Sequence, residues 1–335
     1  MINTRFSDLF GLSYPIVSAP MGLMSGGQLA AAVSNAGGLG TFGATTASRP
    51  VEPEYVEEQI RQIRSHTERP FGIGFITQLI ERNQRNFDIA LDRQVPVILL
   101  SFADPRPWLE KIKAHGATAI CQVQSIDDAH IALAEGADIL AVQGSEAGGH
   151  TGKLNLLPFL AQVLDAFPDT PIIAAGGMAS ARSLAAVLSA GADGAWIGTA
   201  FTAVTEAQEI TDDVKQRILA SDGNNTIQSH VFDILNTHAY QALPWRPDIA
   251  PRTSLNLLLQ TWHGNEEKML EQIKQVADQF VKGRESGDPD VAPDWYGESA
   301  GFVNEIQTAS AFMQELCSEA ERHIEHNIKR ISGRR

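Results

Sequence analysis

The first 205 residues alternate between two kinds of segment, and this alternation most constrains the fold. Short apolar runs lead into glycine- or small-residue turns, and amphipathic stretches follow. Runs that are apolar on both faces and contain Val and Ile are typical of parallel strands covered by helices. The apolar runs are residues 15–21, 39–44, 71–77, 95–102, 117–123, 139–144, 171–177 and 194–201, and the helical patterns are 28–35, 54–66, 79–94, 108–114, 126–134, 156–167 and 181–190. About eight strands alternating with helices over roughly 200 residues predict an α/β fold, a (β/α)8 TIM barrel, with a doubly wound open sheet as the alternative.

Glycine is distributed unevenly, and this divides the chain. Of the 28 glycines, 21 precede residue 205 and 7 follow it. Gly136 and Gly191 each follow a helical pattern and precede an apolar run, so we expect them to end helices in the left-handed conformation. Residues 206–294 are polar and predict a helical cap or insertion, with a helix over 269–280 and a linker over 283–293. Residues 1–205 with about 295–335 then form the barrel and its closing helices.

Composition excludes several functional classes. The net charge is −14 without a basic cluster, which disfavours binding to a nucleic-acid backbone. The 2 cysteines cannot form a disulfide framework, and no apolar run has the length of a membrane span or a signal peptide. We therefore expect a cytoplasmic protein, whereas the oligomeric state is not readable from the sequence.

Three segments rich in small residues lie at the C-terminal ends of predicted strands, where barrel enzymes place their chemistry. Ser18-Ala19-Pro20-Met21-Gly22 closes the first strand and would let a planar ligand lie against the backbone, although a tight turn explains it equally well. Ala174-Ala175-Gly176-Gly177-Met178 and Trp196-Ile197-Gly198-Thr199-Ala200 follow the seventh and eighth strands. Backbone N–H groups of glycine pairs can point at an anion, and Thr199 adds a hydroxyl donor, so one phosphate site would explain both segments.

The segment after the sixth strand, from Gln143 to Gly152, carries a histidine between glycines. We expect His150 to lie in a loop with its imidazole projecting above the barrel, where it suits general-base work or a hydrogen bond to a substrate anion. A histidine that merely caps the loop is the structural alternative. Glu146 either orients this imidazole or is an exposed loop carboxylate.

Other patterns in the sequence give weaker indications of function. Gly38-Leu39-Gly40-Thr41-Phe42-Gly43 fits the G-x-G-x-x-G string, but it follows a helix and enters a strand, which is the reverse of a dinucleotide site. Cys121 is expected to be a small core residue. The histidines show no metal-ligand grouping except His323 and His326, which share a helix with basic residues and fit a solvated face, so no metal site is expected.

Taken together, these segments resemble the nitronate monooxygenases, formerly called 2-nitropropane dioxygenases. The resemblance rests on the residues 19–22, 146–152, 174–177 and 197–201, with the closing segment 295–301, and it covers nearly the whole chain. Its A-G-G-H-x-G element is specific, whereas its glycine pairs are not.

The resemblance implies a barrel that binds FMN and oxidises alkyl nitronates with O2. His150 would be the catalytic residue, and Gly177 with Trp196, Ile197, Gly198 and Thr199 would hold the FMN phosphate. Ala19, Pro20 and Met21 would lie along the isoalloxazine ring. The remaining expected cofactor contacts are Gly22, Gln78, Gln143, Gly148, Gly149 and Gly176. The family's usual asparagine after strand three is Gly74 here, and Gln78 would partly replace it.

Three other functions remain open at this stage. The same A-G-G-H-x-G pattern occurs in a flavin-dependent enoyl-ACP reductase of the same fold, which would need NAD(P)H. An IMP-dehydrogenase-like activity is disfavoured because no cysteine occupies a mouth loop. A flavin-binding barrel without turnover is the third reading, and His150 argues against it, because simple binding would not require a titratable group.

Overall fold

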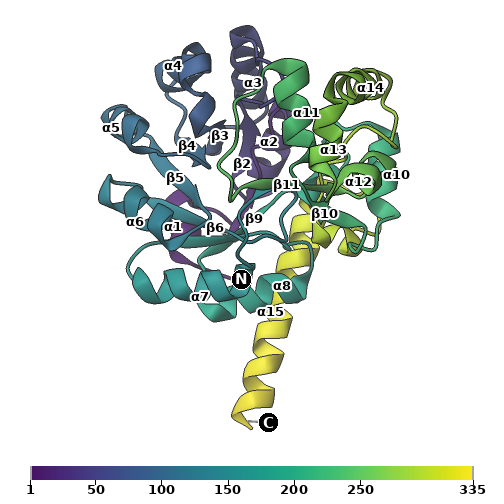
Figure 1. The fold of residues 1–335 in the computed structure, drawn as a ribbon. Helices are drawn as coiled ribbons and strands as arrows, with labels where there is room; N and C mark the ends of the chain where they lie inside the picture. The colour runs from purple at the N-terminus through teal and green to yellow at the C-terminus, as the bar shows by residue number, and fades with distance from the viewer. Residues whose placement is uncertain (1, 334–335) are drawn as a thin grey trace.

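The computed structural model describes residues 2–333 and contains a barrel of eight parallel strands (Figure 1). The strands are β1 (Ile16–Ser18), β2 (Gly40–Gly43), β3 (Phe71–Ile76), β4 (Val97–Ser101), β5 (Thr118–Val123), β6 (Ile139–Gln143), β8 (Ile172–Ala175) and β9 (Gly194–Ile197). They pair in the order β1-β9-β8-β6-β5-β4-β3-β2. A parallel bridge between Val17 and Leu39, with the Leu39 N–H donating to the Ile16 carbonyl at 2.8 Å, joins the first strand to the second. The predicted TIM barrel is confirmed, and the open sheet is excluded.

The outer helices also follow the predicted pattern. They are α2 (Gly27–Asn35), α3 (Pro53–His66), α4 (Gln84–Asp92), α5 (Arg106–Ala114), α6 (Ile126–Ala134), α7 (Leu156–Ala166) and α8 (Ala181–Ala190). Gly136 and Gly191 have φ of 95° and 113°, as expected of glycines that end helices.

Two boundaries differ from expectation. The predicted helix 79–94 begins with two 3-10 turns, η1 (Thr77–Leu79) and η2 (Glu81–Asn83), which bury Leu79 and Ile80 before α4 starts. The predicted strand 194–201 ends at Ile197, because the chain turns at Gly198 into the short helix α9 (Thr199–Thr202).

An apolar core fills the barrel, and an unpredicted helix closes its lower end. Alternate strand residues point inward and pack together, as period-2 side-chain alternation requires. The inward residues include Val17, Val97, Ile120 and Trp196. The helix α1 (Arg5–Phe10) adds Phe6, which is fully buried among them. With the lower end filled, access to the barrel is at the C-terminal ends of the strands.

The chain after β9 is not purely helical, in contrast to the expectation for residues 206–294. It forms α10 (Asp212–Leu219), β10 (Thr226–Gln228), α11 (Val231–Tyr240), β11 (Ala250–Ser254), α12 (Leu257–Trp262), α13 (Glu266–Glu271) and α14 (Ile273–Ser286). The predicted helix 269–280 is interrupted at Gln272, and α14 continues into the predicted linker. This part has its own apolar cluster, which includes Phe232, Leu259 and Phe280.

The two small strands of this region join the barrel through a second sheet. Its antiparallel order is β10-β11-β7, where β7 (Gly149–Thr151) belongs to the segment after β6. The region after β9 is therefore hydrogen-bonded to the segment that carries His150.

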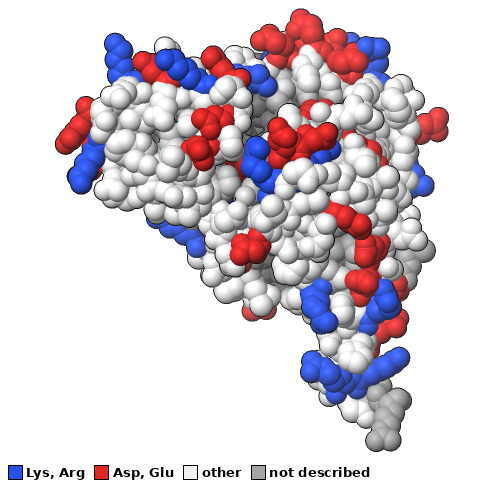
Figure 2. All heavy atoms as spheres, turned by 90° about the vertical axis from the view of Figure 1, so that its right-hand side faces the viewer, with Lys and Arg blue, Asp and Glu red and all other residues white. Residues whose placement is uncertain are grey.

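The closing segment returns to the barrel wall. After η3 (Glu298–Phe302), the long helix α15 (Ala309–Ser332) packs against α8 and α2 and then projects beyond the barrel (Figure 1). Its buried side includes Phe312, Met313 and Leu316. Figure 2 shows acidic and basic side chains interspersed on one face of the molecule. Within residues 2–333, no helix combines the length and the apolar character needed to cross a membrane.

Candidate functional site

A cavity of about 470 Å³ lies at the C-terminal ends of the barrel strands. Its wall includes His150 and all but one of the residues that the sequence assigned to the cofactor. These are Ala19, Pro20, Met21, Gly22, Gln143, Gly148, Gly149, Gly176, Gly177, Trp196, Ile197, Gly198 and Thr199. Gln78 is the exception, because it lies in η1 and outside the lining set. The fold thus brings together residues that are as far as 180 positions apart (19 to 199).

Gly74 lines the cavity where the resembling family usually has asparagine. A Cβ added to Gly74 would overlap the ring of Pro20. The proline ring therefore occupies the volume that a side chain at position 74 would need. This packing accounts for the departure, and Gln78 does not enter the vacated place.

The glycines after β8 and β9 leave several backbone donors free. Gly176 and Gly177 have φ of 103° and 73°, a left-handed region that residues with a Cβ rarely adopt. Within the described chain, the N–H groups of Gly176, Gly177 and Gly198 donate to no protein acceptor. The Thr199 hydroxyl accepts from the Gly297 N–H at 3.0 Å, so its own proton remains available. Free donors in the wall of one cavity suit an anion such as a phosphate.

The closing segment passes directly over the loop after β6. A Cβ on Gly148 would lie 2.5 Å from the carbonyl carbon of Tyr296, so only glycine permits this backbone approach. The contact brings Trp295 and Ser299 into the cavity wall.

His150 lies in β7 and not in the free loop that the sequence predicted. Residues 149–151 pair with residues 250–252 of β11, and His150 lies opposite Pro251. Its carbonyl accepts from Gln143 Nε2 at 3.1 Å, and Gln143 Oε1 accepts from Gln124 Nε2 at 3.0 Å. Backbone pairing on one side and a glutamine relay on the other thus fix the main chain at the histidine.

The imidazole itself is packed between aromatic rings. It stacks on Trp245 with ring centroids 3.6 Å apart and planes 16° apart, and Phe102 approaches it edge-on at 6.1 Å. The His150 side chain is only 10% exposed. Trp245 belongs to the irregular segment between α11 and β11, which Arg246 holds against the barrel through paired hydrogen bonds to Asp128 at 2.8 and 3.1 Å.

The second partner of the imidazole is a carboxylate that the sequence analysis missed. Asp233 in α11 lies with Oδ1 2.8 Å from His150 Nε2, and its side chain is 12% exposed. Burial raises the pKa of Asp233, but attraction and hydrogen bonding from His150, with a further contribution from His230, outweigh it and lower that pKa below its ordinary value. His230 Nδ1 lies 3.9 Å from Oδ2, at ion-pair distance, and the same contact raises the pKa of His230.

The ionised carboxylate determines which ring nitrogen is available. A carboxylate can only accept hydrogen bonds, so His150 Nε2 must donate the proton in this contact. The other nitrogen, Nδ1, has no hydrogen-bond partner among the described residues. It can therefore accept a proton from a substrate, or donate one when the ring is doubly protonated.

Glu146 has neither of the roles that the sequence left open. Both of its carboxylate oxygens accept from the Leu156 N–H at 3.0 Å, so the side chain caps α7 and is half-buried. A carboxylate at a helix N-terminus is stabilised by the free amides and the helix dipole. Asp233 takes the orienting position that was suggested for Glu146.

Cys121 is a buried core residue, as expected, and Cys317 is buried in α15. Burial raises the pKa of both the Cys121 and the Cys317 thiol to about 12, which leaves neither ionised near neutral pH. Across residues 2–333, no group of three or more His, Cys, Asp or Glu side chains could hold a metal ion.

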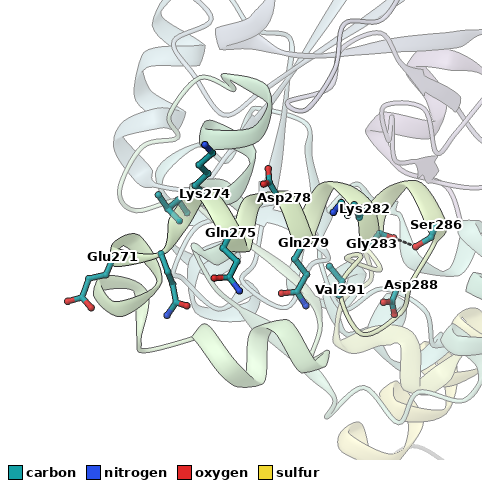
Figure 3. Close-up of a pocket in the computed structure, with 12 residues that line it drawn as sticks. Glu271, Lys274, Gln275, Asp278, Gln279, Lys282, Gly283, Ser286, Asp288 and Val291 are labelled. Carbon is teal, nitrogen blue, oxygen red and sulfur yellow. Dashed lines mark hydrogen bonds between the residues drawn. The ribbon is translucent and has the colours of Figure 1, made fainter.

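A second, larger hollow of about 980 Å³ lies along α14, away from the barrel mouth. Its lining includes Gln275 and Gln279, which lie along one side of the helix, together with charged side chains such as Lys282 (Figure 3). It contains none of the residues that the sequence assigned to the site, and it offers no group comparable to the imidazole and its carboxylate.

Known proteins resemble this chain over most of its length. The family model for nitronate monooxygenase matches residues 3–86 and 76–319. The Neurospora crassa nitronate monooxygenase is 29% identical and covers 92% of this chain and 89% of its own. A Rhodococcus jostii protein named (3aS,4S,5R,7aS)-5-hydroxy-7a-methyl-1-oxo-octahydro-1H-indene-4-carboxyl-CoA dehydrogenase is 33% identical over 72% of this chain and 68% of its own.

Two solved structures share the architecture. FabK from Thermotoga maritima superposes with a TM-score of 0.84 at 26% identity, covering 97% of this chain and 98% of its own. The nitroalkane oxidase from Streptomyces ansochromogenes has a TM-score of 0.77 at 26% identity, covering 96% of this chain and all of its own.

Proposed function

Since the chain belongs to the nitronate monooxygenase family, we propose that it is an FMN-dependent oxidoreductase that oxidises alkyl nitronates with O2 and releases a carbonyl compound and nitrite among the products. The observation that carries the proposal is the His150–Asp233 pair in the wall of a glycine-lined cavity at the barrel mouth. The substrates are then a small organic molecule and O2.

The residues of the cavity fit a flavin mononucleotide. The unpaired N–H groups of Gly176, Gly177 and Gly198, with the Thr199 hydroxyl, would hold the phosphate. The segment Ala19 to Gly22 lines the cavity and would lie along the ring system. When bound, the flavin would supply the electron transfer to O2, and the protein would supply position and electrostatics.

The chain's own contribution to the substrate step is proton handling at His150. Neutral imidazole with Nε2–H bonded to Asp233 presents Nδ1 as a base for the α-proton of a nitroalkane. Doubly protonated imidazole would instead stabilise a nitronate anion, and the buried carboxylate would stabilise that positive ring. The stack on Trp245 excludes water from one face of the imidazole in either state.

Replacement of His150 tests the proposal directly. We expect His150→Asn to retain bound FMN and to lose most turnover of ethyl nitronate, because asparagine carries no positive charge that could stabilise the nitronate anion. His230→Asn is the matched control, because that imidazole is 45% exposed and also faces Asp233. Unchanged turnover in the FMN-loaded His150→Asn protein would refute the role of His150, and a colourless protein that cannot be reconstituted with FMN would refute the cofactor.

A second candidate function is NAD(P)H-dependent reduction of an enoyl thioester. The specific observation in its favour is the 33% identity to a protein named as a carboxyl-CoA dehydrogenase, together with the A-G-G-H-x-G pattern at residues 147–152. Anaerobic mixing separates the two candidates. Rapid bleaching of the flavin by NADPH would favour the reductase, whereas bleaching by a nitronate alone would favour the monooxygenase.

A further inference from the structure

Two arginines from distant parts of the chain line the same cavity as His150. Arg284 belongs to α14, and Arg49 belongs to the loop between β2 and α3. The two segments are in contact, because Arg284 Nη2 donates to the hydroxyl of Ser48 at 3.3 Å. Neither arginine takes part in the proton chemistry described above.

Arg284 is half-buried, and its partners among residues 2–333 are neutral. Its Nη1 donates to Asn236 Oδ1 at 3.1 Å, and the guanidinium lies over the rings of Tyr240 and Phe280 at 5.3 and 5.5 Å. Burial lowers the pKa of Arg284 from its ordinary value, and repulsion from Arg49 adds to this effect. A buried cation without a carboxylate is costly, because hydrogen bonds to neutral groups replace only part of its hydration.

Arg49 presents a guanidinium that is entirely free. Its backbone is fixed, since the N–H of Arg49 donates to Thr46 Oγ1 at 3.3 Å and its carbonyl accepts from the same hydroxyl at 2.6 Å. Its side chain is exposed and forms no hydrogen bond or ion pair within residues 2–333. An anchored loop thus carries five N–H donors at the edge of the cavity.

The carboxylates of the cavity wall do not pair with either arginine. Asp294 is paired with Arg217 through two hydrogen bonds of 2.6 and 3.0 Å. Glu209 lies against Gly26 with its Oε2 buried and without a hydrogen-bond partner, and it forms no ion pair with Arg49 or Arg284 in the described chain. Within residues 2–333, neither arginine is therefore paired with a carboxylate.

We propose that Arg284 and Arg49 form a subsite for an oxyanion, a carboxylate or a phosphate, that the substrate carries at the end remote from its reacting carbon. The inference deepens the proposed function and rests on it for the identity of the reacting end. Asn236 and Ser48 use one N–H on each terminal nitrogen of Arg284 and leave other donors free. Planar guanidinium groups match carboxylate and phosphate oxygens in pairs, which fits this ligand class.

The kinetic test compares two nitronates that differ in the second anion. We expect Arg284→Gln and Arg49→Gln each to lower kcat/KM for 4-nitrobutanoate nitronate at least tenfold through KM, and to leave kcat/KM for 1-nitrobutane nitronate within about twofold. Lys282→Gln is the matched control, because it removes one positive charge from an exposed side chain of α14 outside this cavity. Equal effects of Arg284→Gln on the two nitronates, or an equal effect of Lys282→Gln, would overturn the subsite.

A binding test separates the two sources of the anion and does not depend on turnover. Calorimetric titration of the flavin-loaded protein with glutarate and with pantetheine 4′-phosphate should show binding of one or both that Arg284→Gln weakens at least tenfold. Preference for glutarate assigns the subsite to a substrate carboxylate, and preference for the phosphate assigns it to a thioester's pantetheine arm. Failure of both to bind would overturn the subsite even if nitronates are oxidised. Binding without nitronate turnover would leave the subsite standing and refute the proposed monooxygenase.

Discussion

Replacement of Asp233 by asparagine should separate nitroalkane from nitronate turnover. The substitution Asp233→Asn keeps the size of the side chain and removes its charge. An amide can donate as well as accept, so it permits the tautomer of His150 in which Nδ1 carries the proton and cannot act as a base. A nitroalkane must lose an α-proton, whereas a preformed nitronate has already lost it. We therefore expect the variant to impair nitroethane oxidation much more than ethyl nitronate oxidation.

The size of the effect follows from the geometry of the contact. Asp233 Oδ1 and His150 Nε2 are 2.8 Å apart, and the two side chains are 12% and 10% exposed, so solvent screens them little. Hydrogen bonds to charged groups contribute about 1.5–3 kcal/mol. At about 1.36 kcal/mol for each factor of ten, this corresponds to a roughly 10- to 150-fold loss of kcat/KM for nitroethane.

Initial rates with both substrates at one pH, normalised to bound FMN, measure this loss. Asp278→Asn is the control, since it removes an exposed carboxylate of α14. An unchanged kcat/KM for nitroethane, or an equal loss on both substrates, would refute the argument that the carboxylate selects the tautomer.

Three further predictions concern stability and cofactor retention. Gly74→Asn should lower the unfolding free energy by about 1–3 kcal/mol and reduce the FMN content of the purified protein, because the new side chain overlaps Pro20; a protein of unchanged Tm and FMN content would contradict this. Gly177→Ala should lower the unfolding free energy by about 1–2 kcal/mol, because alanine disfavours the φ of 73°, and it should also weaken FMN binding; the added Cβ itself would meet Glu146 only at an ordinary 3.8 Å. Calorimetric unfolding and FMN titration would measure the two effects, and unchanged values would contradict the proposed phosphate site. Because the pKa of Asp233 is lowered, its contribution to stability is fully present above the carboxyl's unfolded pKa and is lost as pH falls through the folded pKa. Because the pKa of His230 is raised, its contribution is fully present below the imidazole's unfolded pKa and is lost as pH rises through the folded pKa. The stability difference between the wild type and Asp233→Asn, measured by urea unfolding, should therefore be largest between about pH 4 and 6.5, and a difference that does not vary with pH would exclude the linkage.

The barrel could be predicted from the sequence because its strands are buried on both faces. Such strands read as continuous apolar runs, and all eight predicted runs contain a strand. The strands β10 and β11 had no such signal. β11 contains Pro251 and Arg252, and its pairing with β7 joins residues about 100 positions apart. Their existence depends on that distant partner and not on local pattern.

The candidate site could likewise be predicted only in part. His150 and the glycines were identifiable because unusual residues stand together in one short segment. Asp233 lies on an amphipathic helix, where a carboxylate that bonds an imidazole has the same local sequence as one that faces water. Arg284 of α14 and Trp245 of the irregular segment were also missed, since only the fold shows which side chains of the region after β9 face the barrel.

The position of the imidazole depends on both parts of the chain at once. Gln143 of β6 holds the main chain of His150 from the barrel side, while Asp233 and Trp245, which belong to the region after β9, hold the ring from the other side. A hydrogen bond of 2.8 Å and a ring stack of 3.6 Å tolerate displacements of only a few tenths of an ångström. The region after β9 is therefore a component of the proposed site, because a barrel that bound flavin without it would keep the histidine and lose the carboxylate that selects its reactive nitrogen.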